Sequence, residues 1–115
     1  MRFMTLWRPG KNANRPEPQM VAEMGKLIEE MAKAGVMVAT GGWEPSGPCT
    51  MARMSGGKIS VTDGPYAEAK EAIGGFCLLE VKSRDEALEW TSRFMRIAGE
   101  GTCEVRPLMG PPDER

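Results

Sequence analysis

The stretch GFCLLEVKSRDEALEWTSRFMRIAGEGTCEVRP, residues 75–107, decides the fold of this chain. It begins with a short apolar run that predicts a strand. Ser83, followed three residues later by Glu86, is a capping-box pattern and predicts the start of a helix. Residues 102–107 alternate polar and apolar side chains, as a half-buried strand does, and Pro107 ends that strand because proline lacks a backbone N–H. The stretch therefore predicts a β-α-β unit.

A matching unit precedes it. Residues 2–7 form a short apolar run that predicts a strand, and residues 36–39 predict another. Between them, residues 17–34 carry apolar side chains at helical spacing, with Gly35 placed to end the helix. The apolar positions of this helix are Met20, Val21, Met24, Leu27, Ile28 and Met31.

The segment between the two units predicts a β-hairpin. Residues 50–54 and 58–62 read as strands, joined by a Ser-Gly-Gly turn whose glycines supply positive φ angles. Two β-α-β units around a hairpin predict an α+β, ferredoxin-like sandwich with both helices on one face of the sheet. The other face needs a cover, and a second copy is the simplest one, which predicts a homodimer forming a dimeric α+β barrel with ligand-sized space inside. The alternative is a monomer with a polar second face.

Composition limits the class of protein. The chain has 115 residues, 41% of them hydrophobic and 27% charged, which suits one domain over residues 1–108 followed by a flexible tail over 109–115. The formal charge is −1 and no segment concentrates lysine and arginine, so no nucleic-acid partner is expected. Without a run of about 18 apolar residues or a signal peptide, the sequence predicts a cytoplasmic protein with no membrane contact.

The cysteines and the missing histidine restrict the chemistry. Cys49, Cys77 and Cys103 are odd in number and widely spaced, so free thiols are expected rather than disulfides or a zinc site. The chain contains no histidine, which removes the commonest general base and metal ligand. The Gly-Gly-Lys sequence at 56–58 lacks the other positions of a phosphate loop. No metal, nucleotide or other cofactor is expected.

One polar motif stands out, DGPYAEAKE at residues 63–71. Together with the segments 74–76, 86–90 and 104–107, it resembles the signature of the YCII-related family, also called the DGPF domain family. The resemblance implies a ferredoxin-like fold that assembles as a dimeric α+β barrel. It also implies relatives that act on small cyclic organic molecules, including a dehydrochlorinase, and others associated with extracytoplasmic-function sigma factors. Catalytic branches pair a histidine with the aspartate, which this chain cannot do, and Tyr66 replaces the usual phenylalanine.

The motif supplies most of the candidate site residues. Asp63 is either a proton-transfer or ligand-binding group or a structural cap for a short helix beginning at Pro65. Tyr66, Glu68 and Lys70 are candidate ligand-binding residues at a pocket rim, and for the latter two the alternative is a solvated turn.

Two arginines complete the set of candidates. Arg53 and Arg106, both on predicted strands, are placed to bind a substrate carboxylate or to form surface ion pairs. Trp90 and Phe94, one helical turn apart, are read as core residues rather than as a stacking platform.

Three functions are consistent with this pattern. The first is a small-molecule-binding dimer with an accessory or regulatory role. The second is an acid/base enzyme, an isomerase or a dehydrochlorinase-like lyase, that uses Asp63 as a base on a small cyclic compound, with Arg53 or Tyr66 stabilising negative charge. The third is a protein-interaction module linked to a sigma factor.

Overall fold

The computed structural model describes residues 1–44, 47–63 and 73–110 of the chain. In chain order its elements are β1 (Arg2–Ala13), α1 (Pro18–Lys33), β2 (Met37–Gly42), β3 (Thr50–Ser55), β4 (Lys58–Asp63), β5 (Gly75–Glu80), α2 (Arg84–Ala98) and β6 (Gly99–Pro107). The predicted order of strands, helices and hairpin is confirmed.

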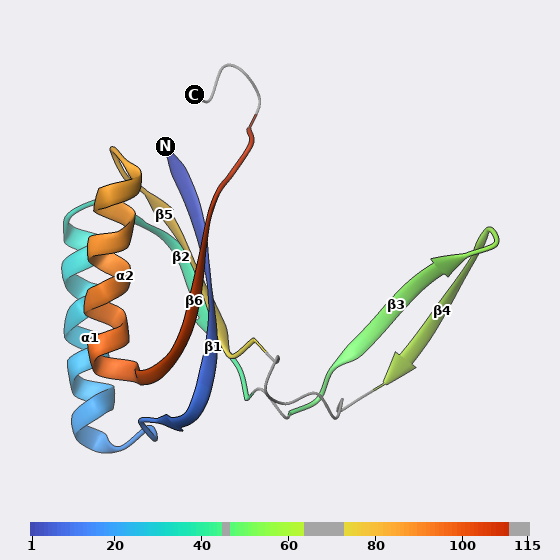
Figure 1. Ribbon diagram of the computed structural model, residues 1–115, viewed down its shortest axis with the longest axis horizontal. Coiled ribbons are helices and arrows are strands. Elements are labelled where there is room, and N and C mark those ends of the chain that lie inside the picture. The colour runs from blue at the N-terminus through green and yellow to red at the C-terminus, as the bar shows by residue number, and fades with distance from the viewer. Residues whose placement is uncertain (45–46, 64–72, 111–115) are drawn as a thin grey trace.

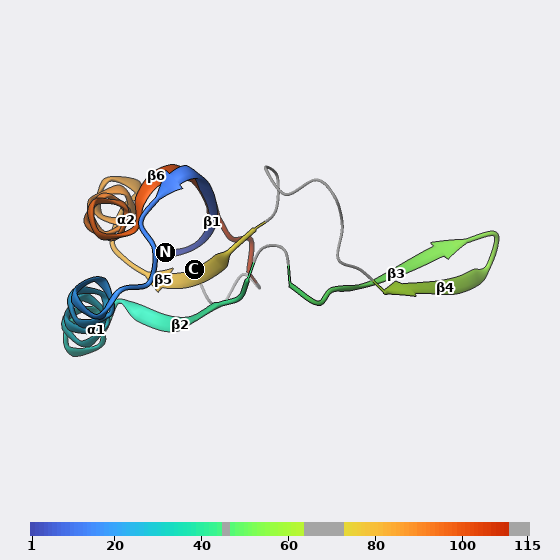
Figure 2. The ribbon, with the colours of Figure 1, turned by 90° about the horizontal axis from the view of Figure 1, so that it is seen from below.

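Four of the strands form one antiparallel sheet in the order β2-β5-β1-β6. Both helices lie on one face of this sheet, side by side, and the opposite face carries no helix of the described chain (Figures 1 and 2). The predicted α+β class is therefore confirmed, and the arrangement is compatible with a ferredoxin-like fold. Neither α1 nor α2, the helices of the described segments, is long and apolar enough to cross a membrane.

Three strands extend well beyond the residues that the sequence predicts. β2 continues past residue 39 to Gly42. β1 continues past residue 7 to Ala13, and β6 begins at Gly99 rather than at 102. For β1 and β6 the reason is their mutual pairing, which runs from Phe3 opposite Pro107 to Ala13 opposite Gly99, with an irregularity after Pro9. Local composition favours a loop here, but partners distant in the sequence supply the ladder hydrogen bonds.

The helix ends predicted from local sequence signals are confirmed. The Ser83 side chain accepts a hydrogen bond from the Glu86 N–H at 3.1 Å, as the capping box predicts. The Glu86 carboxylate in turn accepts from the Lys82 N–H at 2.8 Å. Helix α1 has proline in its first turn and ends before Gly35, whose φ of 73° is the left-handed conformation that favours glycine.

The core lies between the helix layer and one end of the sheet. Its buried residues are Phe3, Leu27, Met31, Val36, Leu79, Val81 and Ala87. Trp90 and Phe94 pack against this cluster from α2, as predicted, and Phe94 meets Trp7 edge to face at 5.3 Å between ring centroids. The two helices are also joined by an ion pair between Arg93 and Glu30.

The helix-free face of the sheet is partly apolar. Register places four half-buried side chains on it, in the middle of the sheet: Met4, Leu6, Phe76 and Leu78. Glu104 accepts hydrogen bonds from Arg8 and Arg106 on the same face and flanks this stripe. A face of this composition can pack against another apolar surface.

Strands β3 and β4 form a separate two-stranded hairpin. It projects from the body on the side of the sheet opposite the helices, at the right of Figure 1. Its turn contains Gly56 and Gly57 with φ of 58° and 78°, so the glycine prediction is confirmed. The radius of gyration is 16.1 Å, above the roughly 13 Å of a compact domain of this length.

Candidate functional site

A cleft of about 520 Å³ lies between the helix layer and the sheet, next to the core. Apart from Trp7, the helix-facing positions at this end of the sheet are small, whereas those at the other end are filled by Phe3 and Leu79. The small positions are Thr5, Thr40, Gly42, Gly75, Cys77 and Cys103. The volume falls within the 300 to 1,000 Å³ typical of ligand pockets.

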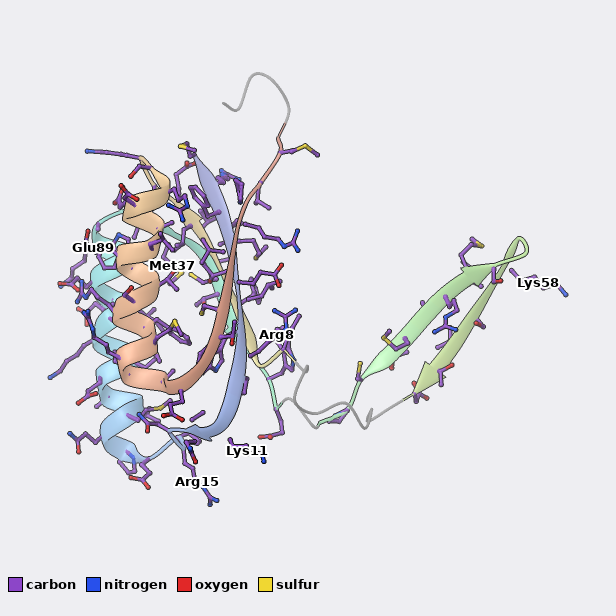
Figure 3. The ribbon with its side chains drawn as sticks, viewed as in Figure 1. Arg8, Lys11, Arg15, Met37, Lys58 and Glu89 are labelled. Atoms are coloured by element: carbon purple, nitrogen blue, oxygen red, sulfur yellow. The ribbon has the colours of Figure 1, made fainter. Side chains whose placement is uncertain are left out.

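The cleft walls are mainly aromatic and sulfur-containing. Trp7 and Phe94 form one side, at their edge-to-face contact. Trp43 and Phe76, 6.4 Å apart between ring centroids, border the cleft at the edge of the sheet, although the strand register turns the Phe76 side chain toward the helix-free face. Methionines from α1 and β2 complete the walls: Met20, Met24, Met31 and Met37, the last labelled in Figure 3. Such walls are polarizable and adaptable, and they suit a flat apolar ligand.

Few polar groups line the cleft, and most are already hydrogen-bonded. Thr5 donates to the Cys77 carbonyl at 3.3 Å, and Thr40 donates to the Phe76 carbonyl at 2.9 Å. Asn14 donates its side-chain N–H to the Ile97 carbonyl at 2.8 Å. Of the lining residues that the structure describes, Glu44 carries the charged side chain.

Burial keeps the two thiols of the cleft protonated. It raises the pKa of Cys77 to about 11, with a hydrogen bond from Thr40 opposing the shift. Burial also raises the pKa of Cys103 to about 11, helped by the neighbouring Cys77. The Cys77 thiol lies 3.3 Å from the Met37 sulfur. Neither thiol is a nucleophile at neutral pH, because the thiolate is the reactive form.

The hairpin holds two of the residues predicted as site residues, on opposite faces. Asp63 ends β4 and is exposed; its carboxylate accepts a hydrogen bond from the Thr50 hydroxyl at 2.9 Å. Cross-strand pairing puts Asp63 beside Thr50, and Arg53 beside Ser60. Side chains alternate between faces along a strand, so Arg53 and Asp63 point in opposite directions. Neither residue lines the cleft.

Arg106 lies elsewhere, on the helix-free face of the sheet. It forms an ion pair with Glu104, which also pairs with Arg8 at 2.8 Å (Arg8 is labelled in Figure 3). Hydrogen bonds from Arg106 and then Arg8 lower the pKa of Glu104 below its usual range. Arg106 is thus engaged in a surface ion pair and is brought together with neither Asp63 nor Arg53.

The remaining predictions for the motif, and most of the predicted tail, fall outside the described residues. These are Tyr66, Glu68, Lys70, the helix cap at Pro65 and most of the predicted tail, 111–115. Across the part of the chain that the structure describes, no three histidine, cysteine or acidic residues gather as a metal site would require.

A model of the YCII-related domain family matches residues 1–110, nearly the whole chain. The chain belongs to the YCII-related family. It is also 30% identical over 93 residues to an uncharacterized protein of Rhizobium meliloti (strain 1021), a match that covers 80% of this chain and 75% of the relative. The family resemblance seen in the sequence is therefore confirmed.

Sequence reasoning missed the cleft of this YCII-related protein. It treated Cys77 and Cys103 only as free thiols and gave no role to Thr5 or Thr40. The available signal was the alternation along the strands, which puts Thr5, Trp7 and Cys77 on the same side as Phe3 and Leu79. That signal identifies the helix-facing positions, but the space between them depends on how the helices pack.

Alkylation of the three cysteines directly tests whether the two thiols that line the cleft are buried. Iodoacetamide at pH 8 should alkylate exposed Cys49 in the folded YCII-related protein and leave Cys77 and Cys103 largely unmodified. At that pH, about one in a thousand thiols with a pKa of 11 is ionised, and the rate should rise about tenfold per pH unit. Peptide mass spectrometry after timed labelling measures the alkylation rate of each cysteine. Equal labelling of all three cysteines would contradict the described burial.

Proposed function

We propose that this YCII-related protein is a homodimeric α+β barrel that binds a small, uncharged or weakly basic aromatic molecule, in an accessory or regulatory role. The observation that carries the proposal is the apolar cleft between the helices and the sheet. The ligand proposal rests on the cleft and the dimer proposal on the helix-free face of the sheet, and Phe76 borders both. The two proposals are tested separately.

The lining supports an aromatic ligand of neutral or positive charge. Indole, phenyl and thioether groups at Trp7, Phe94 and Met37 offer flat, polarizable contacts. None of the lining residues in the described segments is a lysine or an arginine, whereas Glu44 supplies a carboxylate. A carboxylate ligand would lose its hydration there without gaining a cationic partner among the described residues, which costs free energy.

The chemistry of the cleft favours binding over catalysis. Its thiols are protonated, and the chain has no histidine to act as a general base. The alternative enzyme hypothesis relies on Asp63, which the structure places on the exposed hairpin with Arg53 on the opposite face. Binding of a ligand without a reacting group nearby supports an accessory or regulatory role.

The homodimer is supported by the helix-free sheet face. Met4, Leu6, Phe76 and Leu78 form an apolar stripe that no helix of the described chain covers. Packing this face against the same face of a second copy would close a barrel of two sheets about 10 Å apart. Light scattering at micromolar concentration tests this part, and a particle of 12.6 kDa would contradict it.

The ligand proposal is tested with three one-ring probes of different charge: benzyl alcohol, benzylamine and benzoate. At about ten times its Kd, a probe adds about 1.4 kcal/mol of stability and raises Tm by about 5 °C. We expect such shifts for the first two probes and a smaller shift for benzoate. Equal shifts for all three would contradict the inferred charge preference.

Matched variants locate the site. Met24→Trp fills the cleft and should abolish the probe-induced shift, whereas Val21→Trp, on the exposed side of the same helix, should keep it. Asp63→Asn should also leave the probe-induced shift of Tm unchanged. If Asp63→Asn abolishes the shift and Met24→Trp does not, the ligand binds at the base of the hairpin and the cleft proposal is wrong.

A further inference from the structure

The β3–β4 hairpin has one apolar face and one polar face. Residues paired directly across two antiparallel strands point to the same side. The pairs Ala52–Val61 and Met54–Ile59 therefore share one face, and the pairs Arg53–Ser60 and Ser55–Lys58 share the other. At the base of the hairpin, the pair Thr50–Asp63 belongs to the first face and the pair Met51–Thr62 to the second. Such a division is typical of a strand pair that covers something on one side and faces water on the other.

Nothing in the described chain covers the apolar face. Met54, Ile59 and Val61 are 65%, 66% and 64% exposed. A two-stranded hairpin is marginally stable alone in water and needs packing on one face. The hairpin stands clear of helices and sheet alike, with the labelled Lys58 near its far end (Figure 3).

We infer that this hairpin is an arm whose apolar face packs against a second copy of the chain. The inference rests on the proposed homodimer and adds the element that makes it stable. The arm projects on the same side as the apolar sheet face, toward the place where that second copy would lie (Figures 1 and 2). Each copy would give one arm and receive one, so the contact is reciprocal and closes as a two-fold dimer.

The area that a specific interface buries favours a second copy of the chain as the partner that the arm contacts. With strands 4.8 Å apart and a rise of 3.3 Å per residue, contact between two four-stranded faces buries only about 800 Å² in total. This is the size of a crystal contact. Two docked arms roughly double the buried area to about 1,600 Å², the standard size of a specific interface. The sheets alone are too small for a stable dimer, and the arms supply the difference.

The charges on the hairpin agree with this orientation. Arg53 and Lys58 lie on the face opposite Val61 and Ile59, so docking the apolar face leaves both cations in water. No charged side chain lies among the two apolar pairs. Asp63 shares the apolar face but lies at the base of the hairpin, beside Thr50, at the edge of the contact. Docking the two apolar pairs therefore buries apolar surface without burying Arg53 or Lys58.

A pair of adjacent substitutions tests the arm. Ile59→Asp places a carboxylate on the apolar face, and Ser60→Asp places the same charge one residue away on the polar face. Sedimentation equilibrium should show the dimer Kd raised about 100-fold by Ile59→Asp and by no more than about threefold by Ser60→Asp. The milder Val61→Ser should raise it about tenfold, which keeps the test informative if aspartate disturbs the hairpin.

Hydrogen exchange supplies a second readout. The β4 amides should be protected in the wild-type dimer and exchange faster in Ile59→Asp. If the wild-type chain is a dimer but Ile59→Asp and Ser60→Asp alter its Kd equally, the arm inference is overturned while the homodimer stands. A monomeric wild-type chain overturns both, and the probe-induced shifts of Tm still decide the ligand proposal independently.

Discussion

Replacing Leu79 with alanine should lower the free energy of unfolding by about 4 kcal/mol. Leu79 is 1% exposed and lies at the centre of the core, opposite Phe3 on one neighbouring strand and Met37 on the other. Truncation removes buried methyl groups and leaves a cavity that these strand-held neighbours cannot fill. Urea denaturation at fixed protein concentration measures the loss.

The matched control is Val21→Ala on the outer side of α1, where the valine is 55% exposed. It should change the free energy of unfolding by less than about 0.5 kcal/mol, because little apolar surface is lost and alanine favours a helix. Similar losses in the two variants would contradict the described position of the core.

Replacing Gly101 with alanine should lower the free energy of unfolding by about 3 kcal/mol. A Cβ atom at this position would lie 2.4 Å from the Trp7 ring and 2.6 Å from the Arg8 carbonyl oxygen. The first contact displaces the indole from the cleft wall, and the second is with backbone and separates β1 from β6. Thermal unfolding should show the loss, and tryptophan fluorescence should report the displaced ring.

Gly25 provides a control of opposite sign. It lies inside helix α1, and a Cβ there would meet nothing within 4 Å. Gly25→Ala should stabilise the protein by up to about 1 kcal/mol, because alanine loses less conformational freedom in a helix. Destabilisation by both alanine substitutions would contradict the contacts described at these two glycines.

Local sequence signals predicted the elements well. The Ser83 cap, Gly35 at the end of α1 and the glycine turn of the hairpin were each set by neighbours within a few residues. Strand ends were predicted less well, because β1 beyond residue 7 depends on β6, about 90 residues away in the chain. The cleft was not predicted, because its lining depends on packing between distant segments, and the role of Asp63 stays a prediction.

The sequence by itself determined the α+β class, the order of the elements and the glycine turn of the hairpin, because spacing and turn residues act locally. Its motifs also identified the family. The tertiary structure decided where space remains and which apolar faces stay uncovered. Thr5, Cys77 and Cys103 line a cleft because two helices bridge over small side chains. Met54 and Ile59 stay exposed because the hairpin projects away from the sheet. Both outcomes depend on how distant segments pack, which no local pattern encodes.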